Sequence, residues 1–126
     1  MTRRQQIEDI IIGTLVCNFT KYWNDMRFCI TPDMMQDPLN ARTLRRMGEL
    51  DAMGITPTIK TLTGEDPDMD FHVAHVAIDG DFDSKRAEYH MIQHITGQRE
   101  YTQVTFDQYV TRYIELHEQE YKDIPA

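Results

Sequence analysis

Long apolar stretches and paired cysteines are missing from this sequence. No stretch approaches the roughly 20 apolar residues of a membrane-spanning helix. The first apolar run is short and is broken by Glu8 and Asp9, so we expect no signal peptide. Cys17 and Cys29 lack the CxxC spacing of a zinc pair, so we expect buried free thiols in a reducing compartment. These absences predict a cytoplasmic protein with no membrane partner.

The sequence also lacks an excess of basic residues over acidic ones. The chain has 13 Lys and Arg against 21 Asp and Glu, a formal net charge of −8. Proteins that bind nucleic acids present a basic face to the phosphates. The two small basic clusters, Arg3-Arg4 and Arg42 with Arg45-Arg46, are more typical of solvated helix faces. We therefore expect no direct contact with nucleic acid.

Helical periodicity is the main positive signal. Apolar residues recur at three- and four-residue spacing in the first turns, and a second apolar row follows on the other flank. The first row is Ile7, Ile10, Ile11, Thr14 and Leu15, and the second is Ile12 and Val16. This pattern predicts a central helix that is covered on two sides. Asn18 is expected to cap a second helix.

Capping residues followed by proline predict further helix starts at Thr31-Pro32, Asp37-Pro38 and Thr56-Pro57. Gly54 is expected to end the helix that begins at Pro38. Residues 65–70 are predicted to form a loop and residues 79–81 a turn. Residues 71–78 fit either a strand or a helix face, and we favour the helix because no partner strand is predicted elsewhere.

The last third of the chain predicts two more helices. Asp83 or Ser84 is expected to cap a helix that runs to Thr96, and Thr105 with Gln108 forms a capping box for the final helix. At 126 residues the chain fits a single domain, residues 1–126. We predict an all-α fold, a compact orthogonal bundle of six to eight helices with a long C-terminal helix.

Phosphate-binding loops are missing as well. Neither G-x-x-x-x-G-K-[ST] nor G-x-G-x-x-G occurs, so the sequence offers no glycine cradle for a triphosphate. No G-x-S-x-G nucleophile motif is present either. We expect a protein that is not an enzyme, with no catalytic residue, cofactor or resident metal.

Paired histidines keep one alternative open. His72 and His75 are three residues apart and His90 and His94 are four apart, so each pair shares one helix face. If the two pairs converged, the chain would be a small helical metal-binding protein or metalloenzyme. Partly buried histidines at the edge of a core explain the same spacing without an ion.

A tyrosine-rich stripe runs along the final helix. Tyr109, Tyr113 and Tyr121 follow the apolar positions of that helix, and a phenol tolerates a half-exposed surface. These three tyrosines are the candidate partner interface, through which we expect a homodimer.

The order of parts over residues 6–62 resembles the N-terminal head domain of DnaB-type replicative helicases. That family opens with an E-x-x-[IV]-[IL]-G-x-[LM]-[LM] helix, and a polar residue, a helix face and a glycine stop follow. In this sequence the opening helix matches at Glu8, Ile11, Ile12, Gly13, Leu15 and Val16. The later match runs through Asn40, Leu44, Met47, Leu50, Gly54, Ile55, Thr58 and Leu62.

The resemblance covers residues 1–64, whereas residues 65–126 form an acidic second half without a clear counterpart. It implies a non-catalytic protein-interaction module of DNA replication or replisome assembly. Such a module would pair with itself or bind a replicative helicase or primase. We also expect a complete small protein of phage or mobile-element type.

Overall fold

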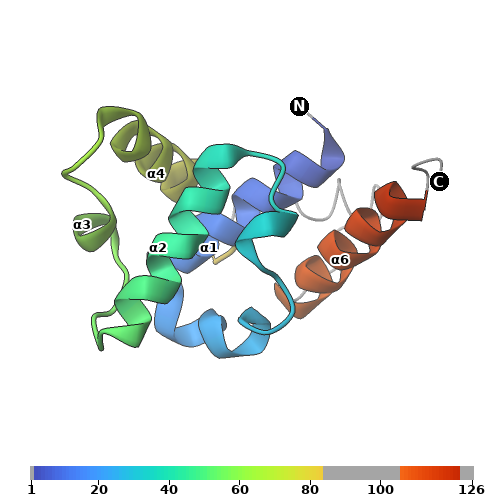
Figure 1. Cartoon of the computed structure of the whole chain (residues 1–126), viewed down its shortest axis with the longest axis horizontal. Coiled ribbons are helices and arrows are strands. Elements are labelled where there is room, and N and C mark those ends of the chain that lie inside the picture. The colour runs from blue at the N-terminus through green and yellow to red at the C-terminus, as the bar shows by residue number, and fades with distance from the viewer. Residues whose placement is uncertain (1, 84–105, 123–126) are drawn as a thin grey trace.

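The computed structural model describes residues 2–83 and 106–122, and within them the fold is all-α, as predicted (Figure 1). No strand occurs in these ranges. The elements in chain order are α1 (Arg3–Met26), the 3-10 helix η1 (Pro32–Met34), α2 (Pro38–Ala52), α3 (Ile59–Leu62), α4 (Pro67–Asp79) and α6 (Phe106–Lys122).

Helix α1 is the centre of the bundle. It contacts α2, α4 and α6, and Figure 1 shows it lying behind α2. Residues on both of its flanks are buried, among them Ile7 and Leu15 on one flank and Ile12 and Val16 on the other. The prediction of a central helix covered on two sides is therefore confirmed.

The predicted boundary at Asn18 is a kink inside α1. Asn18 has non-helical backbone angles, φ −141° and ψ 52°, between two helical halves. Beyond the kink, the rings of Phe19 and Trp23 stack with their centroids 4.8 Å apart. The second half of α1 can therefore follow a different direction from the first.

Several predicted helix boundaries are confirmed. Proline occupies the first turn of both η1 and α2, and the Asp37 carboxylate accepts the backbone N–H of Leu39 at 2.8 Å. Gly54 ends α2 with φ +76°, and the N–H of Ile55 reaches back to the carbonyl of Leu50 at 2.9 Å. This is the closure that a left-handed glycine permits.

Two predicted boundaries are wrong. Helix α3 is capped by Thr58 rather than Thr56, because the Thr58 hydroxyl accepts the N–H of Thr61. The expected loop over residues 65–70 contains the start of α4, where Asp66 caps the helix and Pro67 occupies its first turn. The predicted helix over 71–78 is confirmed, whereas the turn predicted over 79–81 begins one residue later, because Asp79 is the last residue of α4 and Gly80 is its C-cap. The expected helix that runs to Thr96 and the Thr105 cap lie outside the described residues.

The cysteines also differ from expectation, since Cys17 and Cys29 are both exposed. Their apolar neighbours, Val16 and Ile30, turn into the core instead, so an apolar stretch does not bury each of its members. No described helix is both long enough and apolar enough to cross a membrane.

Candidate functional site

The carboxylate of Glu8, on α1, lies at the centre of a buried polar network. Its side chain is fully buried and accepts the backbone N–H groups of Gln36 and Asp37, each at 2.9 Å. It also accepts the hydroxyl of Tyr113 at 2.7 Å and the side-chain amide of Asn40 at 3.0 Å. Four donors from three segments thus compensate one buried charge, which would otherwise be strongly unfavourable.

Tyr109 and Tyr113 of α6 are part of the core and not of a surface. Tyr109 and Tyr113 are both 0 % exposed, and burial raises the pKa of each phenol above its usual value. The expectation that they form an exposed partner interface is therefore wrong in the folded monomer. They turn inward because α6 packs on α1, which places the Tyr113 hydroxyl against Glu8. The side chain of Tyr121 lies outside the described part of the chain.

Asn40 extends the network from α1 to α4. Its amide nitrogen donates to Asp9 at 2.7 Å as well as to Glu8, and its oxygen lies 2.6 Å from Nε2 of His72. Burial raises the pKa of the Asp9 carboxyl and lowers the pKa of the His72 imidazole, since both charged forms lose hydration. One amide therefore connects three helices.

The predicted histidine pairs do not form as expected within the described residues. His72 is buried against Asn40, whereas His75 is exposed and its Nδ1 lies 3.0 Å from Asp79. His90 and His94 lie outside the described residues. His72 and His75 are three residues apart on α4, as expected, but one imidazole is buried and the other is exposed.

The structure instead brings His72 close to Asp9 and Asp37, with one candidate ligand atom of each within 4.8 Å of the others. Sequence reasoning missed this grouping because its members come from α1, the cap of α2 and α4. The sequence indicated only that Asp37 caps a helix, and Asp37 does cap α2 in the structure. Two carboxylates and an imidazole form a donor set that suits a divalent transition metal.

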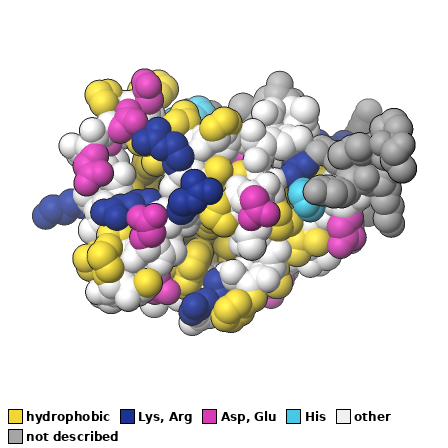
Figure 2. All heavy atoms as spheres, viewed as in Figure 1, with side chains coloured by type: hydrophobic (Ala, Val, Ile, Leu, Met, Phe, Trp, Pro, Cys, Tyr) yellow, Lys and Arg dark blue, Asp and Glu magenta, His cyan; other side chains and the backbone are white. Residues whose placement is uncertain are grey.

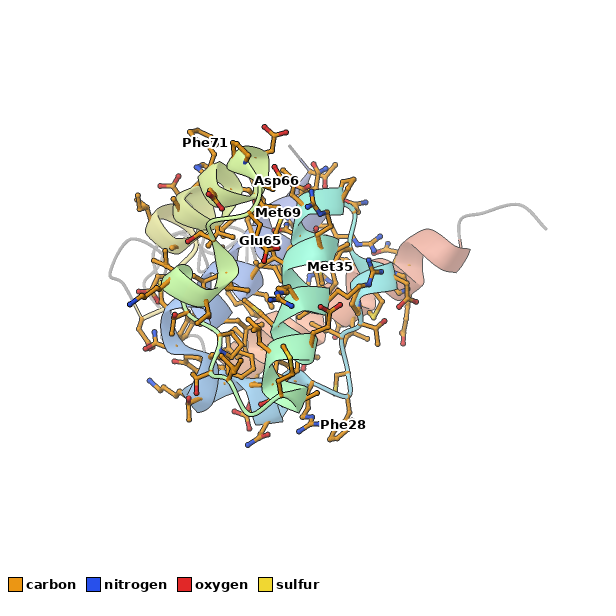
Figure 3. The ribbon with its side chains drawn as sticks, turned by 60° about the vertical axis from the view of Figure 1, so that its left-hand side comes forward. Phe28, Met35, Glu65, Asp66, Met69 and Phe71 are labelled. Carbon is orange, nitrogen blue, oxygen red and sulfur yellow. The ribbon has the colours of Figure 1, made fainter. Side chains whose placement is uncertain are left out.

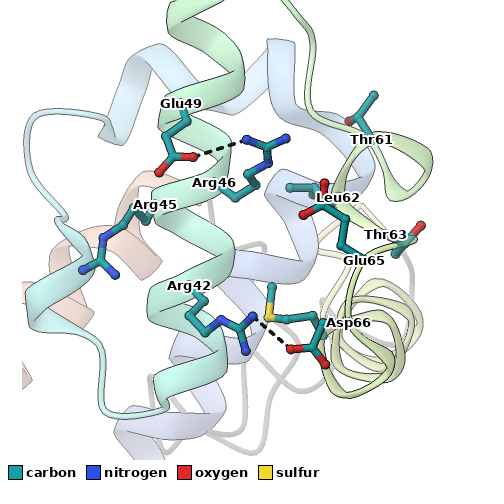
Figure 4. Close-up of a pocket in the computed structure, with 10 residues that line it drawn as sticks. Arg42, Arg45, Arg46, Glu49, Thr61, Leu62, Thr63, Glu65 and Asp66 are labelled. Atoms are coloured by element: carbon teal, nitrogen blue, oxygen red, sulfur yellow. Dashed lines mark hydrogen bonds and ion pairs between the residues drawn. The ribbon is translucent and has the colours of Figure 1, made fainter.

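A surface pocket of about 270 Å³ lies between α2, α3 and the start of α4 (Figure 4). Arg42 bonds Asp66 at 3.0 Å across the pocket, and Arg46 bonds Glu49 on its own helix at 3.3 Å. The lining residues are Arg42, Arg45, Arg46, Glu49, Thr61, Leu62, Thr63, Glu65, Asp66 and Met69. The basic cluster noted in the sequence is therefore part of a defined hollow.

Charges of both signs line this pocket, three arginines against three carboxylates. Figure 2 shows Lys and Arg side chains on this face interspersed with acidic ones. Exposed ion pairs of this kind add little stability and exchange readily with water or another polar group. The balance disfavours a phosphate backbone and suits the mixed polar contacts of a protein surface.

Comparison of the chain with protein-family models, with curated proteins and with solved structures found no match.

Proposed function

We propose that this protein is a non-catalytic interaction module that resembles the DnaB helicase head and acts in DNA replication or replisome assembly. One observation carries the proposal: the polar positions of the resemblance meet in space. Glu8 and Asn40 are 32 residues apart, yet the Asn40 amide donates to the Glu8 carboxylate in the buried network. Apolar periodicity alone would not produce such a contact.

Gly13, another position of the resemblance, supports the same proposal. A Cβ at this position would lie 1.9 Å from the carbonyl oxygen of Val76 and 2.9 Å from the Cα of Gly80. Helix α4 therefore crosses α1 at a point where only glycine fits. The acid, the glycine and the polar residue of the resemblance each have a specific role in how α1 meets its neighbours.

The proposed mechanism is protein–protein contact without chemistry, in the cytoplasm, through a second copy of the chain or through a replicative helicase or primase. The mixed-charge pocket at α2 and α3 offers polar contacts on one face. The net charge of −8 opposes association with nucleic acid. A phage or mobile-element origin would fit a free-standing module of this kind.

Two measurements test the proposal. Size exclusion with light scattering should report a dimer, or immobilised protein should retain purified replicative helicase or primase. Reversal of charge in Arg42→Glu with Arg46→Glu should weaken retention, whereas Lys60→Glu on α3 serves as a matched exposed control. A monomer at high concentration that retains neither partner would exclude this function.

Metal binding is the second candidate, favoured by the grouping of Asp9, Asp37 and His72 within 4.8 Å. It ranks below the interaction module because Asn40 already bonds Asp9 and His72 without an ion. Elemental analysis of the purified protein should find near one Zn, Mn or Fe per chain, lost in Asp9→Asn, if this candidate is correct. A folded protein free of metal that also binds none on titration would exclude it.

A further inference from the structure

Helix α4 is apolar on two opposite faces. Its inner face buries Met69, Val73 and Val76 against the rest of the bundle. Its outer face leaves Phe71 77 % exposed and Ile78 69 % exposed. A helix that only covers a core would carry polar residues on the outer face.

The exposed residues form a continuous row. Phe71, Ala74, His75 and Ile78 follow the i, i+3, i+4, i+7 spacing that places side chains along one helix face, and all four are exposed. We call this set the outer stripe of α4. Single exposed apolar residues are ordinary on protein surfaces, but a helical row of this spacing is typical of a face that receives another helix.

Charge limits what can cover the outer stripe. Helix α4 contains three aspartates, Asp68, Asp70 and Asp79, and no lysine or arginine. Asp68 and Asp79 are eleven residues apart, three turns on one side of the stripe, with His75 between them at 3.0 Å from Asp79. Among the described residues, two basic side chains near the ends of α4 pair with acids outside that helix, Arg42 with Asp66 and Lys21 with Asp83.

From these observations we infer that the outer stripe of α4 is a docking surface for a basic amphipathic helix of a partner protein. The partner helix would place an apolar row on Phe71 and Ile78 and lysine or arginine beside Asp68 and Asp79. A second copy of α4 would bring the aspartates of the two chains together, and an anionic membrane would be repelled by them. The inference stands apart from any role in replication, because it rests on α4 alone.

The outer stripe is also separate from the other exposed phenylalanine of the described residues. In Figure 3, Phe71 lies at one end of the molecule, above Met69 and Asp66, and Phe28 lies at the other. Phe28 is 83 % exposed and has Arg27 over its ring at 4.7 Å. It therefore provides a matched control, an equally exposed phenylalanine in a basic rather than an acidic setting.

The test uses the full-length protein and two labelled synthetic helical peptides in fluorescence anisotropy. Both peptides carry leucine at i, i+3, i+4 and i+7, one with lysine along the edges of that row and the other with glutamate. The lysine peptide should bind and the glutamate peptide should not. Phe71→Ser should weaken binding by about tenfold or more, as expected for an aromatic anchor, and Phe28→Ser should leave the affinity unchanged. Asp68→Asn with Asp79→Asn should weaken binding and reduce its salt dependence.

Three results would overturn the inference. Equal binding of both peptides would remove the charge argument, and equal loss in Phe28→Ser and Phe71→Ser would indicate general apolar adhesion. Self-association that is lost in Phe71→Ser would assign the stripe to a second copy of the chain. Both phenylalanines are exposed, so neither substitution should disturb the fold. Circular dichroism melts of each variant check that the fold is intact.

Discussion

Helix α1 meets α4 on one side and the elements around Glu8 on the other, and the two contacts are of opposite kinds. Against α4 the backbones touch: a Cβ on Gly13 would meet Val76, and one on Gly80 would lie 2.3 Å from the carbonyl oxygen of Asp9. Against α2, the residues just before it and α6, the contact runs through the carboxylate of Glu8 and its four donors. The first contact has no room for an added atom, and the second cannot lose one without leaving polar groups unpaired. The two contacts should therefore respond to opposite kinds of substitution.

The largest effect is expected for Gly13→Ala. The added methyl group would overlap the backbone of Val76, which cannot move away as a flexible side chain would. We expect the free energy of unfolding to fall by more than about 3 kcal/mol, at the upper end of the cost of overpacking. Urea denaturation followed by circular dichroism measures the change.

Gly48→Ala is the matched control, because nothing lies within 4 Å of a Cβ at that position in α2. There the substitution should stabilise the helix by about 0.5–1 kcal/mol. Equal effects at the two glycines would contradict the close crossing of α1 and α4.

The next largest effect is expected for Glu8→Ala. Removing the carboxylate leaves the Tyr113 hydroxyl, the Asn40 amide and two backbone N–H groups to find other partners. We expect a loss of about 2–3 kcal/mol, because a buried donor left without an acceptor costs about 1–3 kcal/mol. Glu49→Ala on the exposed side of α2 should change stability by no more than about 0.5 kcal/mol. Thermal melts of both variants decide the matter, and a similarly mild effect for Glu8→Ala would count against the network.

Thr14→Val tests a polar contact on the α4 side. The Thr14 hydroxyl lies 3.0 Å from the carbonyl oxygen of Gly80 and accepts the N–H of Phe82 at 2.8 Å, so it connects α1 to the chain after α4. The isosteric change should cost about 1–3 kcal/mol by leaving these buried groups unpaired. Thr20→Val on the exposed side of α1 should be close to neutral. Hydrogen exchange of the Phe82 amide should accelerate in Thr14→Val, and unchanged protection would contradict this account.

The smallest effect is a pH dependence that comes from His72. Burial lowers the pKa of its imidazole even though Glu8 and Asp9 of α1 and Asp37 before α2 face it, with His75 on its own helix. The unfolded chain binds this proton near pH 6.5 and the folded chain resists it. The contribution of the neutral His72 to the free energy of unfolding is therefore present above pH 6.5, and it is lost as the pH falls through the pKa of His72 in the folded protein.

His72→Gln should reduce this loss of stability in urea titrations between pH 7 and 5, whereas His75→Gln at the exposed position should not. Asp9 acts in the opposite direction, because its raised pKa gives stability below its ordinary value that is lost as the pH rises through the folded pKa. The comparison is therefore made between each variant and the parent protein at each pH. Identical slopes for His72→Gln and the parent would exclude His72 as the titrating group.

Local signals predicted the helices well where a cap and a proline stand together. Thr31-Pro32 and Asp37-Pro38 begin η1 and α2, and Gly54 ends α2, since these residues act on their own backbone. Asp66-Pro67 is the same combination of a capping residue and a proline, but the acidic residues around it favoured the prediction of a loop. Periodicity also predicted which side of α1 is buried.

Tertiary contacts were less accessible from the sequence. The burial of Tyr113 depends on Glu8, which is 105 residues away, and the meeting of Asn40 with His72 depends on how α2 and α4 cross. Neither has a local signature. The resemblance singled out Glu8 and Asn40 as positions, yet only the structure supplied the reason that they belong together.

The stack of Trp23 on Phe19 gives the protein an optical reporter. Trp23 is the single tryptophan of the chain, and its indole N–H donates to Asp51 of α2 at 3.1 Å. The emission of this one fluorophore therefore senses whether the second half of α1 is docked on α2. Its quenching and spectral shift should follow separation of these two helices directly, without any label, even where the total helix content does not change.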